Sequence, residues 1–406
     1  MDAELGIYLN DLLVGHLRID DNAHGRTEFR LSQAYLSRYP RPVLGQHFED
    51  DLDAIHVSYL NLPPFFSNLL PEGTLRRLVA RDAGVNEARE FYLLAHLGDD
   101  LPGAVRALPL TELDRADIAL STPDHDADAA LGLRFSLAGM QLKFSMLRRG
   151  RGLTLPAHGQ GGDWIVKLPD SRIPDVPEIE YATMQWARAA DIDTPDCELV
   201  PMSQLGGLPP SAASLKGQAL AVRRFDRPDD GSRIHQEDFA QVLGLRPGER
   251  YKKHNYETIG AIILEVAGPA DFEAYVSRLV FMVLSGNADA HHKNWSLRYP
   301  DGVRARLAPA YDQVAVVVYV DDGGLERRLD DLLALNLAGS KHFEDVSLAS
   351  FTRMARRLEY HEDRMRKIVT EAVERIRDAW PEVGLDPTWR TRIERHWQRI
   401  PLLRGA

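Results

Sequence analysis

The sequence predicts an α+β protein made of three consecutive parts. Residues 1–110 mix short strands with helices, residues 111–235 contain mainly strand patterns, and residues 236–406 contain mainly helical patterns. The chain has 406 residues, of which 44% are hydrophobic, so it is long enough to form two or three cores. A strand-rich part followed by a helix-rich part predicts two lobes, preceded by a small α/β subdomain.

In the first part, residues 5–20 predict two short strands joined by an Asn-Asp turn, because both residue types favour turns. Residues 72–82 and 87–97 are expected to be helices, since their apolar side chains recur at helical spacing. The acidic segment 114–130 contains a Ser-Thr-Pro sequence, and we interpret it as a linker or surface loop.

In the second part, residues 141–146 and 164–168 alternate between apolar and other side chains, which predicts two strands with one buried face each. The alternation places Lys167 on the face opposite to the large apolar residues of its strand. Residues 178–190 predict a helix, and residues 219–222 predict a buried strand.

In the third part, an apolar stripe over residues 272–283 predicts a long helix, with Gly286 as its C-cap. Residues 351–380 predict either a pair of amphipathic helices or one long helix. We find no internal repeat in the sequence.

Composition excludes several classes of protein. The net charge of −11 argues against a chain that binds nucleic acid by itself, because neutralising phosphates requires a basic surface. The single cysteine, Cys197, excludes an intrachain disulfide and a cysteine-based zinc site. The N-terminus lacks the features of a signal peptide, and no apolar run reaches the roughly 20 residues of a membrane span. We therefore expect a cytoplasmic protein that is not associated with a membrane.

The segment around residues 286–312 carries the strongest chemical signal. Asp289 and Asn294 are separated by four residues, and a second acid, Asp312, follows after a short hairpin. Protein kinases place a catalytic Asp, a metal-binding Asn and a metal-binding Asp in this order. Each residue alone is more readily explained as part of a turn, but the coincidence of all three predicts phosphoryl transfer from ATP with Mg²⁺.

Phosphoryl transfer also needs cations and a loop around the phosphates. Lys167 is the candidate for the α- and β-phosphates, and a solvated edge-strand lysine is the weaker alternative because its neighbours are apolar. Lys293 could neutralise the γ-phosphate or be an ordinary surface lysine, and the two possibilities remain open. Residues 136–141 precede a strand as a phosphate loop should, but they contain one glycine and do not match GxGxxG.

Two adjacent histidines, His291 and His292, suggest a zinc site only superficially. Neighbouring side chains do not easily bind one metal ion, and no cysteine or suitably spaced histidine completes the set. We expect His291 to pack or to form a hydrogen bond that shapes the loop.

Seven ordered motifs together resemble the HipA family of bacterial toxin kinases, and the similarity spans nearly the whole chain. These motifs are PFFSNLLPEG (64–73), FSLAGMQLK (135–143), WIVKLP (164–169), ALAVRRFDR (219–227), QED (236–238), NADAHHKNWS (287–296) and LAPAYD (307–312). Several motifs in the right order are far more specific than any one of them.

The resemblance implies a bilobed, protein-kinase-like fold and a role for each matching residue. Asp289 is then the catalytic Asp, with Lys293 beside it, while Asn294 and Asp312 bind Mg²⁺ and Lys167 contacts the ATP phosphates. His291 belongs to the same ATP site.

Two further segments take roles from the resemblance. Arg223 and Phe225 lie at the hinge that contacts adenine, and the phosphate loop consists of Ser136, Leu137, Ala138 and Gly139. Ser136 matches a serine that family members autophosphorylate, and a phosphate there would compete with ATP and switch the kinase off.

Three positions depart from the family pattern. Arg223 stands where the family often has Glu, Leu142 replaces a Glu in the phosphate loop, and His292 replaces a small residue. None of these departures removes a group that the reaction requires, so we predict an active enzyme.

The resemblance also implies partners. The expected protein is a serine/threonine protein kinase and the toxin of a toxin–antitoxin pair, with a HipB-like helix-turn-helix antitoxin that mediates contact with operator DNA. An aminoacyl-tRNA synthetase, such as the glutamyl enzyme, is the expected substrate. The alternative is a catalytically weak co-repressor or scaffold, and a small-molecule kinase is a third possibility that the N-terminal motif and the Ser136 loop disfavour.

Overall fold

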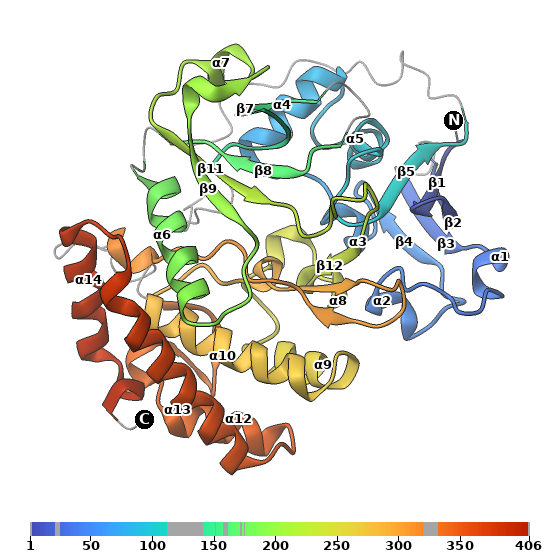
Figure 1. Ribbon diagram of the computed structural model, residues 1–406. Coiled ribbons are helices and arrows are strands. Elements are labelled where there is room, and N and C mark those ends of the chain that lie inside the picture. The colour runs from blue at the N-terminus through green and yellow to red at the C-terminus, as the bar shows by residue number, and fades with distance from the viewer. Residues whose placement is uncertain are drawn as a thin grey trace.

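The chain folds into an N-terminal subdomain, a strand-rich lobe and a helical lobe, in that order along the sequence (Figure 1). The computed structural model describes residues 2–20, 25–111, 141–150, 152–156, 161–170, 173, 175–319 and 332–404. The expected linker at 114–130 and the expected phosphate loop at 136–139 lie outside these residues. Among the described residues, no helix combines the length and apolar character needed to cross a membrane.

The N-terminal subdomain is a five-stranded antiparallel sheet in the order β4-β3-β2-β1-β5. Its strands are β1 (Asp2–Leu9), β2 (Leu12–Asp20), β3 (Arg26–Leu31), β4 (His56–Tyr59) and β5 (Val105–Pro109). Its helices are α1 (Gln33–Leu36), α2 (Gln46–Glu49), α3 (Pro64–Ser67), α4 (Gly73–Ala83) and α5 (Glu90–Leu97). The predicted strand pair and the two predicted helices of this part are confirmed, and they enclose a core of their own.

The strand-rich lobe is a six-stranded sheet in the order β10-β7-β6-β8-β11-β9. Its elements are β6 (Lys143–Arg149), β7 (Gly152–Thr154), β8 (Trp164–Lys167), α6 (Val176–Ala189), β9 (Cys197–Pro201), β10 (Leu205–Gly206), α7 (Pro210–Ala213) and β11 (Gln218–Arg223). Strand β8 lies between β6 and β11, so Lys167 stands opposite Lys143 on one side and Leu220 on the other. This central position excludes the alternative of a solvated lysine on an edge strand.

Helix α6 connects the two lobes. Its apolar face contributes Ile179, Ala182, Trp186 and Ala187 to the core of the helical lobe, although the helix follows β8 in sequence. The indole N–H of Trp186 donates to the carbonyl of Ile376 at 2.9 Å. The helix therefore fixes the strand-rich lobe relative to the helical lobe.

The helical lobe contains more strands than the sequence predicts. Its helices are α8 (Phe239–Val242), α9 (Tyr256–Val266), α10 (Pro269–Ser285), α12 (Leu348–Arg357), α13 (Glu362–Ala379) and α14 (Pro387–Arg399). Its strands are β12 (His235–Asp238), β13 (Ser296–Tyr299), β14 (Arg306–Leu307), β15 (Leu332–Leu337) and β16 (Ser340–His342). The expectation of a mainly helical part missed the antiparallel sheet β12-β13-β14, which pairs strands some 60 residues apart, His235 opposite Tyr299 for example. The region 351–380 is confirmed as a pair of helices.

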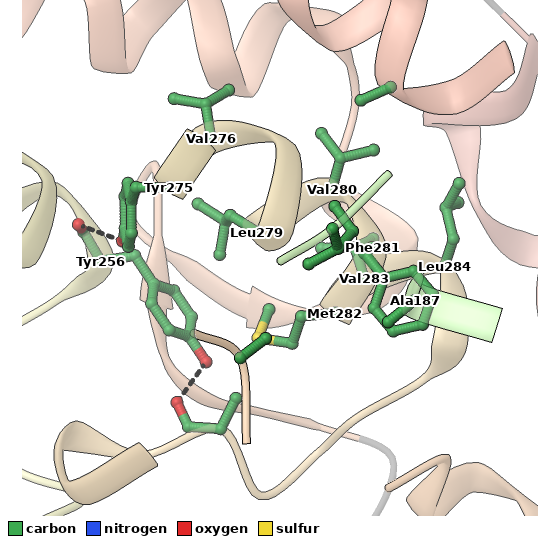
Figure 2. Packing of buried hydrophobic residues seen from close by; sticks show 14 of the residues in the cluster. Ala187, Tyr256, Tyr275, Val276, Leu279, Val280, Phe281, Met282, Val283 and Leu284 are labelled. Carbon is green, nitrogen blue, oxygen red and sulfur yellow. Dashed lines mark hydrogen bonds between the residues drawn. The ribbon is translucent and has the colours of Figure 1, made fainter. Parts of the chain in front are cut away.

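Helix α10 contributes a run of buried hydrophobic residues to the core of the helical lobe (Figure 2). It ends at the predicted glycine. Gly286 has φ +68°, and a Cβ atom there would collide with Val317, so a larger residue would not fit. Tyr275 donates from its hydroxyl to the carbonyl of Tyr256 at 2.7 Å, and Tyr256 donates to the carbonyl of Ala290 at 3.0 Å. The core thus holds the loop that follows α10.

Candidate active site

Four of the predicted site residues meet in one pocket between the lobes. Asp289 and Asn294 come from the loop after α10, Asp312 from the segment after β14, and Lys167 from the end of β8. The described residues that line the pocket are Gln141, Lys143, Lys167, Val176, Glu180, Asp289, Asn294, Asp312 and Val314. Residues 145 positions apart are thereby brought into contact, as Lys167 and Asp312 illustrate.

Lys167 lies between two carboxylates. Its ammonium donates to Glu180 Oε1 at 2.5 Å and also to Asp312 Oδ1. Burial alone would disfavour the charged lysine, but the two carboxylates outweigh burial and raise the pKa of Lys167. Asp312 is buried as well, and the nearby Lys167 and Lys143 hold the pKa of its carboxyl far below the usual range. Lys167 and Asp312 are therefore charged together at neutral pH.

Asp312 has an unusual backbone conformation. Its φ of +51° lies in the left-handed region, which non-glycine residues rarely adopt and which clusters at functional sites. The side chain of Asn287 stabilises this segment, since its Nδ2 donates to the carbonyl of Asp312 at 3.4 Å. The same side chain accepts the backbone N–H of Asp289 at 3.1 Å on its Oδ1. Asn287, which is fully buried, thus ties the two acids to one another.

The loop from Asp289 to Asn294 is held by hydrogen bonds on both sides. Tyr251 donates from its hydroxyl to Asp289 Oδ1. Asn294 Nδ2 donates to the carbonyl of Asp289 at 2.9 Å, which leaves Asn294 Oδ1 as the atom that could bind a cation. The acid and the amide therefore have defined orientations within the pocket.

The donor set of this pocket fits Mg²⁺. Magnesium prefers hard oxygen ligands and is commonly held by one or two carboxylates together with substrate phosphates. Asp312 supplies an ionised carboxylate, and Asn294 supplies the amide oxygen left over from its hydrogen bond. Lys167 places a cation in the same pocket, where it could bind phosphate oxygens.

Lys293 points away from this pocket. Its ammonium donates to the carbonyl and to Oδ1 of Asn68, each at 3.1 Å, and lies 3.3 Å from Glu72 Oε1 and 3.6 Å from Asp238 Oδ2. It is not among the described lining residues of the pocket, so the structure does not bring it to the phosphate position expected from the sequence.

His291 is 2% exposed, and neither ring nitrogen has a hydrogen-bond partner among the described residues. Its ring packs edge-on against Tyr251 at 4.9 Å between centroids. Burial holds the pKa of His291 well below its usual value, so the ring is neutral. The structure agrees with the packing role that the sequence predicts for His291. His291 is not among the described residues that line the pocket, where the family resemblance had placed it.

The predicted hinge residues lie at the end of β11, outside the pocket lining. Arg223 forms ion pairs with Asp163 and, at 2.5 Å, with Asp229, and its backbone N–H donates to the carbonyl of Asp196 at 2.7 Å. The ring of Phe225 stacks on Tyr311 with 5.9 Å between centroids. Ser136, Leu137, Ala138 and Gly139 fall outside the described residues, so their expected contacts with ATP remain predictions.

Comparison with known proteins identifies the family. The family described as "HipA-like C-terminal domain" matches residues 135–380, and the family described as "HipA N-terminal domain" matches residues 5–108. The chain belongs to the HipA family. The Sinorhizobium fredii protein Y4dM is 42% identical to this HipA-family chain over 368 residues, covering 88% of the chain and 86% of Y4dM. The serine/threonine-protein kinase toxin HipA of Shewanella oneidensis is 24% identical over 400 residues, or 87% of each protein.

A solved structure confirms the fold expected from the sequence. A chain in the complex of Shewanella oneidensis HipA, HipB and operator DNA superposes with a TM-score of 0.75 and 20% identity. The superposition covers 98% of this HipA-family chain and 96% of the other chain. The three-part α+β arrangement is therefore the HipA fold.

Sequence reasoning missed three residues of the site in this HipA-family chain. Glu180 is the most important, because protein kinases pair the strand lysine with a Glu of the following helix. The sequence predicts this helix, and an acidic residue in the helix that follows the Lys167 strand is the signal that could have identified Glu180. Asn287 and Tyr251 had no such signal, since their roles depend on contacts with Asp289 that sequence spacing does not reveal.

Proposed function

We propose that this protein is an ATP- and Mg²⁺-dependent serine/threonine protein kinase. The observation that carries the proposal is the ion-paired set of Lys167, Glu180 and Asp312 in one pocket with Asp289 and Asn294. Kinases require the lysine–glutamate pair and the metal-binding Asp to be in place at the same time.

Each residue has a role in the proposed reaction. The γ-phosphoryl group passes from ATP to a hydroxyl oxygen of the substrate, ADP leaves, and Asp289 accepts the hydroxyl proton. Tyr251 orients the carboxylate of Asp289, and Lys167 binds phosphate oxygens. Asn294 and Asp312 would hold Mg²⁺, which neutralises negative charge on the phosphates when bound.

We further propose that the kinase is the toxin of a HipBA-type toxin–antitoxin pair. Membership of the HipA family supports this, as does the likeness to a chain from a complex with HipB and operator DNA. The partner is a HipB-like helix-turn-helix antitoxin. With a net charge of −11 on this chain, the antitoxin supplies most of the phosphate contacts to DNA.

The proposed substrate is a translation factor of the aminoacyl-tRNA synthetase class, and the proposed off-switch is autophosphorylation of Ser136. Both follow from the family resemblance. A phosphorylated Ser136 carries about two negative charges and would repel the phosphates of ATP from the same loop.

The test is a transfer assay with labelled ATP and Mg²⁺, using the protein alone and with purified aminoacyl-tRNA synthetases. We expect label on the protein, mapping to Ser136, and on one synthetase. Asp289→Ala should reduce both by roughly 10²–10⁴-fold, because it removes the proton acceptor. Absence of transfer by the wild type to itself and to every synthetase would refute the proposal.

The alternative is a catalytically weak co-repressor that acts with a DNA-binding antitoxin, and the solved HipA–HipB–DNA complex is the observation that favours it. Expression without antitoxin separates the two functions. A kinase toxin arrests growth and loses that effect in Asp312→Ala, whereas a co-repressor does not arrest growth and represses equally well with either sequence.

A further inference from the structure

The N-terminal motif at residues 64–73 has no role in the chemistry described so far, yet it reaches the loop that carries Asp289. Asn68 follows α3, and Glu72 is the N-cap residue of α4. Asn68 accepts two hydrogen bonds from Lys293, through its carbonyl and its Oδ1, each at 3.1 Å. Its own Nδ2 donates to the carbonyl of Leu245 at 2.7 Å, so Asn68 joins the N-terminal subdomain to the helical lobe.

Glu72 binds two cations of the helical lobe at once. One is Lys293, at 3.3 Å from Glu72 Oε1, and the other is Arg250, whose Nη1 donates to Glu72 Oε2. The three side chains are only 15–24% exposed, so water screens them weakly. Lys293 and Arg250 lower the pKa of Glu72 to about 2 against the opposing effect of burial. Glu72 is therefore ionised across the physiological pH range.

Both cations are connected to the loop that carries Asp289. Lys293 is a member of the loop. Arg250 accepts the ring N–H of His292 on its carbonyl oxygen at 2.5 Å, and its neighbour Tyr251 donates to the carboxylate of Asp289. The loop is thus held at Asp289, His292 and Lys293, and Glu72 contacts both Lys293 and Arg250.

We propose that Glu72 is a positioning residue, through which the N-terminal subdomain holds the catalytic loop in its working conformation. The proposal rests on the kinase function proposed above. It gives the 64–73 motif a role in catalysis, in addition to folding of the subdomain. It also accounts for the position of Lys293, whose ammonium is bound by Asn68 and Glu72 instead of facing the pocket.

The proposal separates binding of ATP from the transfer step. Within the described part of the chain, Lys167, Glu180 and Asp312 form no hydrogen bond or ion pair with Glu72, so loss of its charge leaves the proposed phosphate and metal site intact. The carboxylate of Asp289, by contrast, would lose part of the scaffold that orients it. Small errors in the position of a catalytic group lower the turnover rate steeply.

The experiment compares Glu72→Gln with wild type in the transfer assay. We expect kcat to fall roughly 10- to 100-fold while KM for ATP changes less than about threefold. Glu87→Gln is the matched control, because Glu87 is an exposed acid of the same subdomain whose carboxylate forms no hydrogen bond or ion pair with another described residue. It should behave as wild type, and thermal unfolding of both variants should show that they are folded.

A double substitution distinguishes positioning through Lys293 from a general effect on the subdomain. If Glu72 acts through Lys293, then Glu72→Gln combined with Lys293→Met should be little slower than Lys293→Met alone. Multiplying losses would assign the effect of Glu72 to Arg250 instead of Lys293, whereas an unchanged kcat in Glu72→Gln or an equal loss in Glu87→Gln would overturn the proposal. An inactive wild type would instead refute the proposed kinase function, so the two failures are distinguishable.

Discussion

Two buried charge clusters of this protein look alike in composition but differ in their charge balance and in whether they line a pocket. The hinge cluster contains Arg224, Asp226, Arg227 and Asp100, and the cleft cluster contains Lys167, Glu180 and Asp312. In the hinge cluster, two arginines face two aspartates. In the cleft cluster, one lysine faces two carboxylates.

The hinge cluster is held together by hydrogen bonds within the protein. Arg224 makes a two-pronged contact with Asp226 at 3.0 and 2.8 Å, and Arg227 adds a bond at 2.8 Å to the same carboxylate. Backbone groups of Leu101 and Gly103 complete the network, which links the N-terminal subdomain to the end of β11. Its two arginines pair with two aspartates, so we interpret this cluster as a structural joint.

The cleft cluster lines a pocket in which the carboxylates of Glu180, Asp289 and Asp312 face the ammonium groups of Lys143 and Lys167, an excess of one negative charge when all five are ionised. The two carboxylates share one ammonium, and a divalent cation would balance the remainder. Strongly shifted pKa values beside a pocket are typical of functional sites. The difference teaches that charge balance and access to a pocket, and not burial alone, distinguish a structural ion cluster from a candidate ligand site.

The largest expected effect is a loss of stability when the hinge cluster loses an acid. Asp226→Asn leaves Arg224 and Arg227 buried with one acid fewer, and removing one partner of a buried ion network costs about 3–5 kcal/mol. Urea unfolding followed by tryptophan fluorescence should show this loss as a lower midpoint at pH 7. A change below about 1 kcal/mol would mean that the hinge cluster does not stabilise the fold.

The matching substitution in the cleft is the control for that result. Asp312→Asn removes a carboxylate that Lys167 stabilises but keeps the pair of Lys167 and Glu180, so we expect it to destabilise the protein by less than Asp226→Asn does. Phosphoryl transfer should nevertheless be lost. Equal destabilisation by the two substitutions would erase the distinction between the clusters.

A ligand-binding measurement tests whether the cleft cluster binds Mg²⁺ and ATP. If the surplus charge serves Mg²⁺ and ATP, the two together should stabilise the wild type by about 2.7 kcal/mol at 100 times the Kd. Thermal unfolding should therefore shift upward by several degrees with both ligands. Asp312→Asn should lose most of this shift, while Glu87→Gln should keep it. A shift of equal size without Mg²⁺ would contradict the proposed role of Asp312.

The smallest expected effect concerns a third buried acid, Glu237, which has hydrogen bonds instead of a cation. Tyr299 donates to it at 2.5 Å and the backbone N–H of Gln46 donates at 3.0 Å. Burial raises the pKa of Glu237 to about 8 from 4.5, and the nearby Asp238 and Glu49 act in the same direction. This acid is therefore neutral where Asp226 and Asp312 are charged.

The sign of the resulting pH dependence follows from linkage. Between pH 4.5 and about 8 the folded state holds the proton of Glu237 more tightly than the unfolded state, so its stabilising contribution declines as pH rises. Glu237→Gln removes this titration. The melting temperature of the variant minus that of wild type should be higher at pH 8.5 than at pH 5. Each kcal/mol of relative stability corresponds to roughly 2–4 °C. A constant difference would contradict the shifted pKa.

Much of the fold was predictable because its signals are local. Period-two alternation located β6 and β8, and the apolar stripe located α10 and its end at Gly286. The sheet β12-β13-β14 was not predicted, because short strands become recognisable only when distant partners pair with them. Strand pairing of this kind leaves little trace in the sequence of each strand.

The sequence by itself determined which charged and polar residues the candidate site contains, through the order and spacing of Lys167, Asp289, Asn294 and Asp312. These residues occupy one pocket, as their order predicts for a cleft between two lobes. Only the tertiary structure decided their partners. The pairing of Lys167 with Glu180 and the capture of Lys293 by Asn68 and Glu72 depend on how separate elements pack. Spacing along the chain determines which charged and polar groups can come together, whereas tertiary packing determines which of them form ion pairs.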